Sequence, residues 1–229
     1  MAVVQVQKKS AGALNGVTVT FDSTPTVGNL MIAVHFTRAT ASTQPSGWTE
    51  AVLVNNATES DQLAIYYRVV QSGDGTAYHF GDDNDNHAVG IFEYSGMATS
   101  TPLDVTASTG RTTGATSLSS GTTGSTAQND ELSITGIGLR IPLIANLAVS
   151  PSWSNSFTQE TDSNSAQATN LAQLFTGSHI ETATGTKEST CSWTGALTVM
   201  GVIATFKAAA VGGTAVKDLI MPGMIPFAR

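Results

Sequence analysis

The strongest structural signal in the sequence is the run Asn29-Leu-Met-Ile-Ala-Val-His-Phe36. It is mostly apolar and contains neither Gly nor Pro, which predicts a buried strand in the centre of a sheet. The preceding segment, Gly16-Val-Thr-Val-Thr-Phe21, alternates apolar and polar residues and predicts a half-buried strand. A period of two, rather than 3.6, dominates the rest of the chain as well. We therefore expect an all-β protein.

Turn-forming residues divide the first half of the chain into further short strands. Gly reaches positive φ values, and Asn and Asp bond to their own backbone, so clusters of these residues end strands. Such clusters occupy positions 45–47, 72–75 and 81–86. The segments around them predict strands at Glu50–Val54, Gln62–Val70, Thr76–Phe80 and His87–Tyr94.

The strand pattern restarts in the second half of the chain. Three segments match earlier ones in the same order: Asn129–Gly138 resembles 28–34, 152–160 resembles 47–50, and Gly195–Phe206 resembles His87–Tyr94. This ordered repetition indicates an internal duplication, or a jelly roll whose two halves use the same strand pattern. We predict one antiparallel, jelly-roll-like β-sandwich over residues 1–207. Its related halves cover about 1–107 and 129–207, and a Ser/Thr/Gly-rich connector at 108–128 carries one edge strand.

Composition argues against several classes of partner. Charged residues make up 12% of the 229 residues, about half the usual share. The net charge is −7 and the basic residues are scattered, so we expect no nucleic acid and no membrane surface as partner. Cys191 is the only cysteine and is expected to be a buried core thiol. The first residues do not resemble a secretory signal, so synthesis in a cytoplasm is expected.

The acidic loop before residue 87 is a weak candidate for a cation site. Asp82, Asn84 and Asn86 match the first oxygen ligands of an EF-hand loop, and Glu93 falls at the last ligand position. His87, however, stands where the sharp turn requires Gly, and the residues after it predict a strand rather than a helix. The pattern therefore favours a solvated hairpin turn over a metal site.

No catalytic constellation is recognisable in the sequence. The histidines, His35, His79, His87 and His179, have no metal-ligand spacing, and no strand–Gly-x-Ser-x-Gly–helix motif is present. We expect no catalytic residues, no cofactor and no enzymatic activity. Trp48 and Trp153 occupy similar places in the two halves, which favours a role in closing the core. The alternative is that exposed Trp side chains stack on sugar rings.

The final segment, 208–229, matches nothing earlier in the chain. Gly212 and Gly213 separate it from the last strand, and Pro222 and Pro226 exclude a regular helix or central strand at its end. It nevertheless carries six large apolar residues: Leu219, Ile220, Met221, Met224, Ile225 and Phe227. We predict an arm that docks on a neighbouring subunit or partner. The alternative is that the segment folds back over the sheet of its own subunit.

Five segments together carry a resemblance to a known group of proteins. They are Thr26–Val34, Pro45–Thr49, Leu63–Arg68, Ala88–Gly96 and Pro102–Val105. This series resembles a family of β-sandwich domains found in tailed-phage structural proteins and in large bacterial surface proteins, and the likeness extends more loosely to Phe206.

The resemblance implies a function and a set of partners. We expect a virion structural protein, most specifically a capsid decoration (cement) protein on the head exterior, made in the cytoplasm of a host bacterium. Its partners would be the major capsid protein or another virion protein, and copies of itself, with a trimer favoured by what such decoration proteins tend to be. The alternatives are a carbohydrate-binding or host-attachment module of a head or tail fibre, and another tail or baseplate component.

Overall fold

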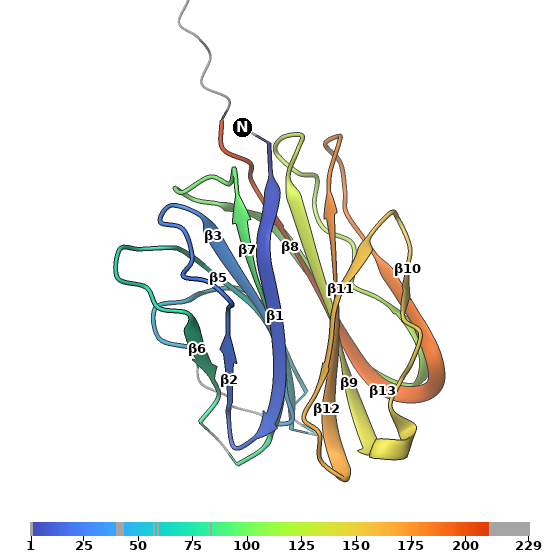
Figure 1. The fold of residues 1–229 in the computed structure, drawn as a ribbon. Coiled ribbons are helices and arrows are strands. Elements are labelled where there is room, and N and C mark those ends of the chain that lie inside the picture. The colour runs from blue at the N-terminus through green and yellow to red at the C-terminus, as the bar shows by residue number, and fades with distance from the viewer. Residues whose placement is uncertain (1, 40–43, 57, 59, 83, 211–229) are drawn as a thin grey trace, which may run out of the picture.

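The computed structural model describes residues 2–39, 44–56, 58, 60–82 and 84–210. The predicted antiparallel, jelly-roll-like β-sandwich of two related halves is confirmed (Figure 1). Among the described residues, no helix has the length and apolar character needed to cross a membrane.

The first sheet takes its strands from the first half of the chain. Its order is β1-β7-β3-β5-β4, and all neighbours are antiparallel. Its strands are β1 (Val4–Leu14), β7 (Asn86–Ser95), β3 (Leu30–Thr37), β5 (Asp61–Val69) and β4 (Thr49–Asn56). A small ribbon of β2 (Val17–Thr20) and β6 (Ala77–Phe80) covers the outer face of this sheet. Because both faces are covered, all residues of β3 are buried, which explains its continuous apolar run.

The second sheet repeats the same path. Its order is β8-β13-β9-β12-β11, so each strand corresponds in turn to one of the first sheet. Its strands are β8 (Leu103–Ser119), β13 (Thr190–Phe206), β9 (Leu132–Leu143), β12 (Thr169–Ile180) and β11 (Thr158–Asn164). The short strand β10 (Ser152–Trp153) pairs with the start of β13, and a 3₁₀ turn, η1 (Ile144–Asn146), follows β9.

The Ser/Thr/Gly-rich segment is more ordered than its composition suggests. Its first part belongs to β8, a 17-residue edge strand that starts at Leu103 and pairs with β13. Thr is β-branched and favours strands, so a Ser/Thr-rich composition suits an exposed edge strand as well as a linker. After Ser119 the backbone remains tied by hydrogen bonds, including those from Ser120 to Ser189 and from Thr123 to Lys187.

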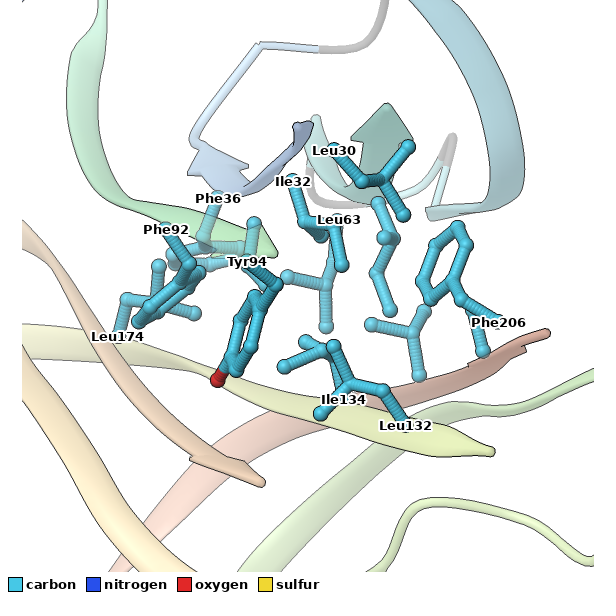
Figure 2. Close-up of a cluster of buried hydrophobic side chains, with 14 of the residues drawn as sticks. Leu30, Ile32, Phe36, Leu63, Phe92, Tyr94, Leu132, Ile134, Leu174 and Phe206 are labelled. Atoms are coloured by element: carbon cyan, nitrogen blue, oxygen red, sulfur yellow. The ribbon is translucent and has the colours of Figure 1, made fainter. Parts of the chain in front are cut away.

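The core lies between the two sheets (Figure 2). The inner face of β3 contributes alternate residues, including Ile32 and Phe36, and β9 faces it with Leu132 and Ile134. Two glycines on β9 make room for the larger side chains of β3. A Cβ atom at Gly138 would lie 2.4 Å from Cδ2 of Phe36. The sheets therefore pack closely at this point because β9 lacks a side chain there.

The strand register gives the sandwich two distinct ends. One end, here called the arm end, holds the start of β1 and the end of β13 (Figure 1). There Met97 pairs with Ala208, and the amide of Ala209 donates to the carbonyl of Gly96 at 2.8 Å. The other end, here called the pocket end, holds the end of β3, the start of β5 and η1. The first residues of the predicted arm are thus tied to the sandwich, and the remainder lies outside the described residues.

Candidate functional site

An ion-pair cluster joins the two sheets at the pocket end. Asp61, the first residue of β5, has a side chain only 2% exposed. Its Oδ1 atom lies 3.0 Å from Nη1 of Arg140 on β9 and 3.9 Å from Nε of Arg38, which directly follows β3. The pairing of an Asp with two guanidinium groups offsets the cost of burying its charge. Arg111 of β8 lines a small adjacent space together with Asp61.

A cavity of about 360 Å³ opens beside this cluster. Arg38 and Arg140 line it together with Asn170 of β12 and Thr198 of β13. The remaining wall is small or apolar and consists of Gly114, Pro142, Ala196 and Leu197. A second cavity of about 320 Å³ shares Pro142, Ala196 and Leu197 and continues along the turn after β9.

Irregular backbone creates the hollow between β8, β12 and β13. The register of β13 against β8 shifts on both sides of Leu197, as at a β-bulge. Asn170 has a φ of 59°, a left-handed conformation that is uncommon outside Gly. Bulges and strained residues of this kind turn side chains out of the regular sheet pattern and often lie beside binding sites.

The cavity has the chemistry of a binding site. Guanidinium groups present planar donors that match carboxylates and phosphates, while Asn and Thr side chains both donate and accept hydrogen bonds. Among the described residues that line it, none is a histidine, a cysteine or a carboxylate. The described lining supplies charge and hydrogen-bonding groups.

The residues proposed for a cation site differ in exposure and are not brought together around one point. The Asp82 side chain is 80% exposed and pairs with Nε2 of His79, and Asn84 is also exposed. Asn86 is buried within β7. Glu93 lies seven residues further along β7, roughly 23 Å away. Its carboxylate instead accepts hydrogen bonds from the amide of Thr26 and the side chains of Asn29 and Gln7.

The described part of the chain also contains no other candidate metal site. There, no group of three or more His, Cys, Asp or Glu side chains is placed to hold an ion. The EF-hand pattern fails because β7 is extended, which carries Glu93 to the arm end instead of returning it to the loop.

Two of the histidines meet although they lie on separate strands. His35 of β3 and His87 of β7 are buried, and Nε2 of His35 lies 3.0 Å from Nδ1 of His87. Burial, with smaller contributions from the charges of His87 and His79, lowers the pKa of His35 to about 3. Antiparallel pairing sets His87 opposite Thr37, two residues from His35. Side chains in such diagonal positions on adjacent strands can reach one another, so the strand register predicts the contact between His35 and His87. The fourth histidine, His179, packs beside Phe157.

The tryptophans belong to the body of the sandwich. Trp48 is 5% exposed, and its ring packs against Tyr78 and Phe80. The residue that corresponds to it in the second half is Phe157, which directly precedes β11 as Trp48 precedes β4. Trp153 lies instead on β10, so the expected equivalence of Trp48 and Trp153 is wrong. The two motifs differ by the insertion of this short strand.

The structure tests the prediction for Cys191, whereas the apolar residues predicted for the arm lie outside its described part. Cys191 is buried, as predicted, and burial raises the pKa of its thiol to about 12. The apolar residues of the arm, Leu219, Ile220, Met221, Met224, Ile225 and Phe227, lie outside the described residues.

Comparison with known proteins adds no functional assignment. The chain matches no protein-family model, no curated protein and no solved structure.

Proposed function

We propose that this protein is a structural component of a tailed-phage virion, specifically a decoration protein that binds the exterior of the head as a homo-oligomer. The observation that carries the proposal is the attachment of the C-terminal segment. Ala208 and Ala209 are paired with Met97 and Gly96 through main-chain hydrogen bonding, so the apolar sequence after residue 210 starts from a defined point on the sandwich.

The surface around that point also favours an interface. Val4 and Val6 of β1 are 53% and 47% exposed and lie at the arm end. Each large apolar side chain that becomes buried contributes about 1.5–3 kcal/mol. Burial of six such residues would favour attachment to a neighbour or to a capsid lattice, less the entropy lost in ordering the segment, and repeated contacts would strengthen it further.

A deletion of residues 211–229 tests this proposal. The deleted segment lies beyond the last described pairing, so we expect an unchanged melting temperature, a lower oligomeric state in analytical ultracentrifugation, and loss of binding to heads assembled from the major capsid protein. A matched control keeps the segment but replaces Leu219, Ile220, Met221, Met224, Ile225 and Phe227 with Ser. Unchanged oligomeric state and head binding in both variants would overturn the proposal.

A second candidate function is a carbohydrate-binding or host-attachment module of a head or tail fibre. The cavity lined by Arg38 and Arg140 favours it, because the strand register places its lining residues at the pocket end, opposite the attached segment. Binding of the chain to host cells rather than to heads would support this candidate over decoration. A position in the tail or baseplate of an imaged virion would support the remaining alternative.

A further inference from the structure

Exposed apolar side chains gather at the pocket end, on the turn that follows β9. Leu143, Ile144 and Val149 are 50%, 48% and 53% exposed, although they lie close together in the sequence. The amide of Thr194 donates to the carbonyl of Val149 at 3.2 Å, which ties this turn to β13. Exposed apolar residues that lie side by side, unlike scattered ones, often mark a place where another polypeptide binds.

A groove of about 320 Å³, here called the η1 groove, lies beside these side chains. One wall is the η1 turn, and the other is the part of β13 that leaves the ladder with β8 between Ser192 and Leu197. None of the described residues that line it is charged. Ala145, Leu147, Ala196 and Leu197 supply apolar side chains, and Asn146 and Thr194 supply polar ones.

We propose that the η1 groove receives the apolar segment Leu219–Phe227 of a neighbouring copy of this chain. The inference rests on the proposed function, in which that segment attaches the subunit, and it names the surface on which the segment docks. The segment reads Leu-Ile-Met-Pro-Gly-Met-Ile-Pro-Phe and contains no charged side chain, which matches the uncharged lining of the groove. Each apolar side chain that leaves water in the groove favours binding.

The two prolines of the segment favour docking through side chains. Pro222 and Pro226 have no amide proton, and their rings fix φ. The segment therefore has fewer backbone donors to satisfy in a groove and less conformational freedom to lose when it binds. Asn146 and Thr194 can pair with the main-chain groups that remain.

The length of the chain favours a neighbour's groove over the groove of the same subunit. The last described pairing of the chain lies at the arm end, whereas the groove lies at the pocket end (Figure 1). Along β13, the stretch from Leu197 to Phe206 alone spans roughly 30 Å. The chain from Ala210 to Leu219 reaches at most about 32 Å when it is fully extended. It therefore has no slack for a path around the outside of its own subunit.

A neighbour whose pocket end lies beside the arm end removes this limit and can receive all six large apolar side chains. Docking of this kind is heterologous, because different surfaces of the two copies meet. Heterologous contacts close into a ring when the rotation between copies closes, and otherwise they extend into a filament. A closed ring agrees with the homo-oligomer of the proposed function.

A charge placed in the groove of the full chain tests the inference. Ala145→Glu and Ala196→Glu change exposed side chains, so the melting temperature should stay close to that of the natural chain. The subunit association constant, measured by sedimentation equilibrium, should fall at least about tenfold, because a docked segment would cover a charge that has no partner. Ala77→Glu, at an exposed position of β6, is the matched control and should associate as the natural chain does.

Unchanged association in both groove variants, or a natural chain that is monomeric, would overturn the inference. The proposed function stands in that case when deletion of 211–229 still abolishes head binding, because the segment then attaches elsewhere. The two proposals can therefore fail separately.

Cross-linking distinguishes a neighbour's segment from the subunit's own. One full chain carries Met224→Cys and a second carries Ala145→Cys, while Cys191 is buried and is not expected to react. A short bismaleimide should join the two chains in a mixture, and the product should be absent when the second chain carries Ala77→Cys instead. In a chain with both Met224→Cys and Ala145→Cys, a cross-link formed only within monomers would show that the segment folds back on its own subunit and would overturn the inference.

Discussion

The two ends of the sandwich are closed by different kinds of interaction. The arm end is closed by main-chain pairing and by apolar residues, among them Val3, Met97 and Ala208, which are 8%, 4% and 7% exposed. The pocket end is closed by buried charge, with Asp61 between Arg38 and Arg140. Both ends bury residues from the two halves of the chain, and both bury carboxylates. Asp61 at the pocket end pairs with guanidinium groups, whereas Glu93 at the arm end accepts hydrogen bonds from Thr26, Asn29 and Gln7.

This difference indicates which end suits which task. Apolar packing and backbone hydrogen bonds tolerate many neighbours, because the hydrophobic effect is non-directional. Buried charges require a defined partner geometry and leave polar groups beside the cavity. The arm end thus combines apolar packing with main-chain pairing, whereas the pocket end places guanidinium groups beside a cavity.

The largest effect is expected from removing the negative charge at the pocket end. Asp61→Asn leaves the guanidinium groups of Arg38 and Arg140 next to a neutral amide, and breaking a buried ion pair in this way costs about 3–5 kcal/mol. The free energy of unfolding, measured with urea, should fall by that amount. Asp22→Asn is the matched control, because its side chain is 80% exposed, and it should change stability by less than about 0.5 kcal/mol. Similar losses in both variants would show that the cluster does not close this end.

A smaller loss is expected from the arm end. Met97→Ala removes a side chain that packs in the main core and lies beside the pairing with Ala208, and such truncations cost about 2–4 kcal/mol. The same urea measurement applies, with Val4→Ala as the exposed apolar control. A loss below about 0.5 kcal/mol for Met97→Ala would contradict apolar closure of the arm end.

Lowering the pH should decrease the stability contributed by His35, toward the pocket end, and increase the stability contributed by Glu131, near the arm end. His35 has a pKa of about 3 in the folded protein, against about 6.5 when unfolded, so the unfolded state binds the proton first. The stability contributed by neutral His35 is complete above pH 6.5 and is lost as the pH falls, by about 2 kcal/mol between pH 7 and pH 5. Near the arm end, burial raises the pKa of Glu131, so its contribution rises as the pH falls.

The free energy of unfolding, measured at a series of pH values, separates the contributions of His35 and Glu131. His35→Asn should flatten the loss of stability between pH 7 and pH 5. Glu131→Gln should remove the stability that protonation of Glu131 adds as the pH falls. The interpretation fails when His35→Asn gives the same slope as the natural chain.

Features that depend on local sequence were predicted, and features that depend on contacts between distant segments were not. The buried run of β3 was recognised because coverage of both faces makes every residue apolar, which is a local signal. The full length of β8 was not recognised, because its pairing with β13 is non-local and its Ser/Thr/Gly composition is also that of a linker. The pocket was missed for a related reason. Asp61 and Arg140 are 79 residues apart, and only the packing of one sheet on the other brings them together.

The smallest expected effect is the coupling between the two ends. The strands that separate them span roughly 23 Å, well beyond the 7–10 Å over which mutational effects usually interact. The stability losses of Asp61→Asn and Met97→Ala should therefore add in the double variant to within about 0.5 kcal/mol. A larger interaction energy, measured in a double-mutant cycle at one pH and ionic strength, would mean that the ends are not independent. Independence matters for the inferred docking, because a neighbour's segment in the η1 groove would then leave the pairing of Ala208 with Met97 unchanged.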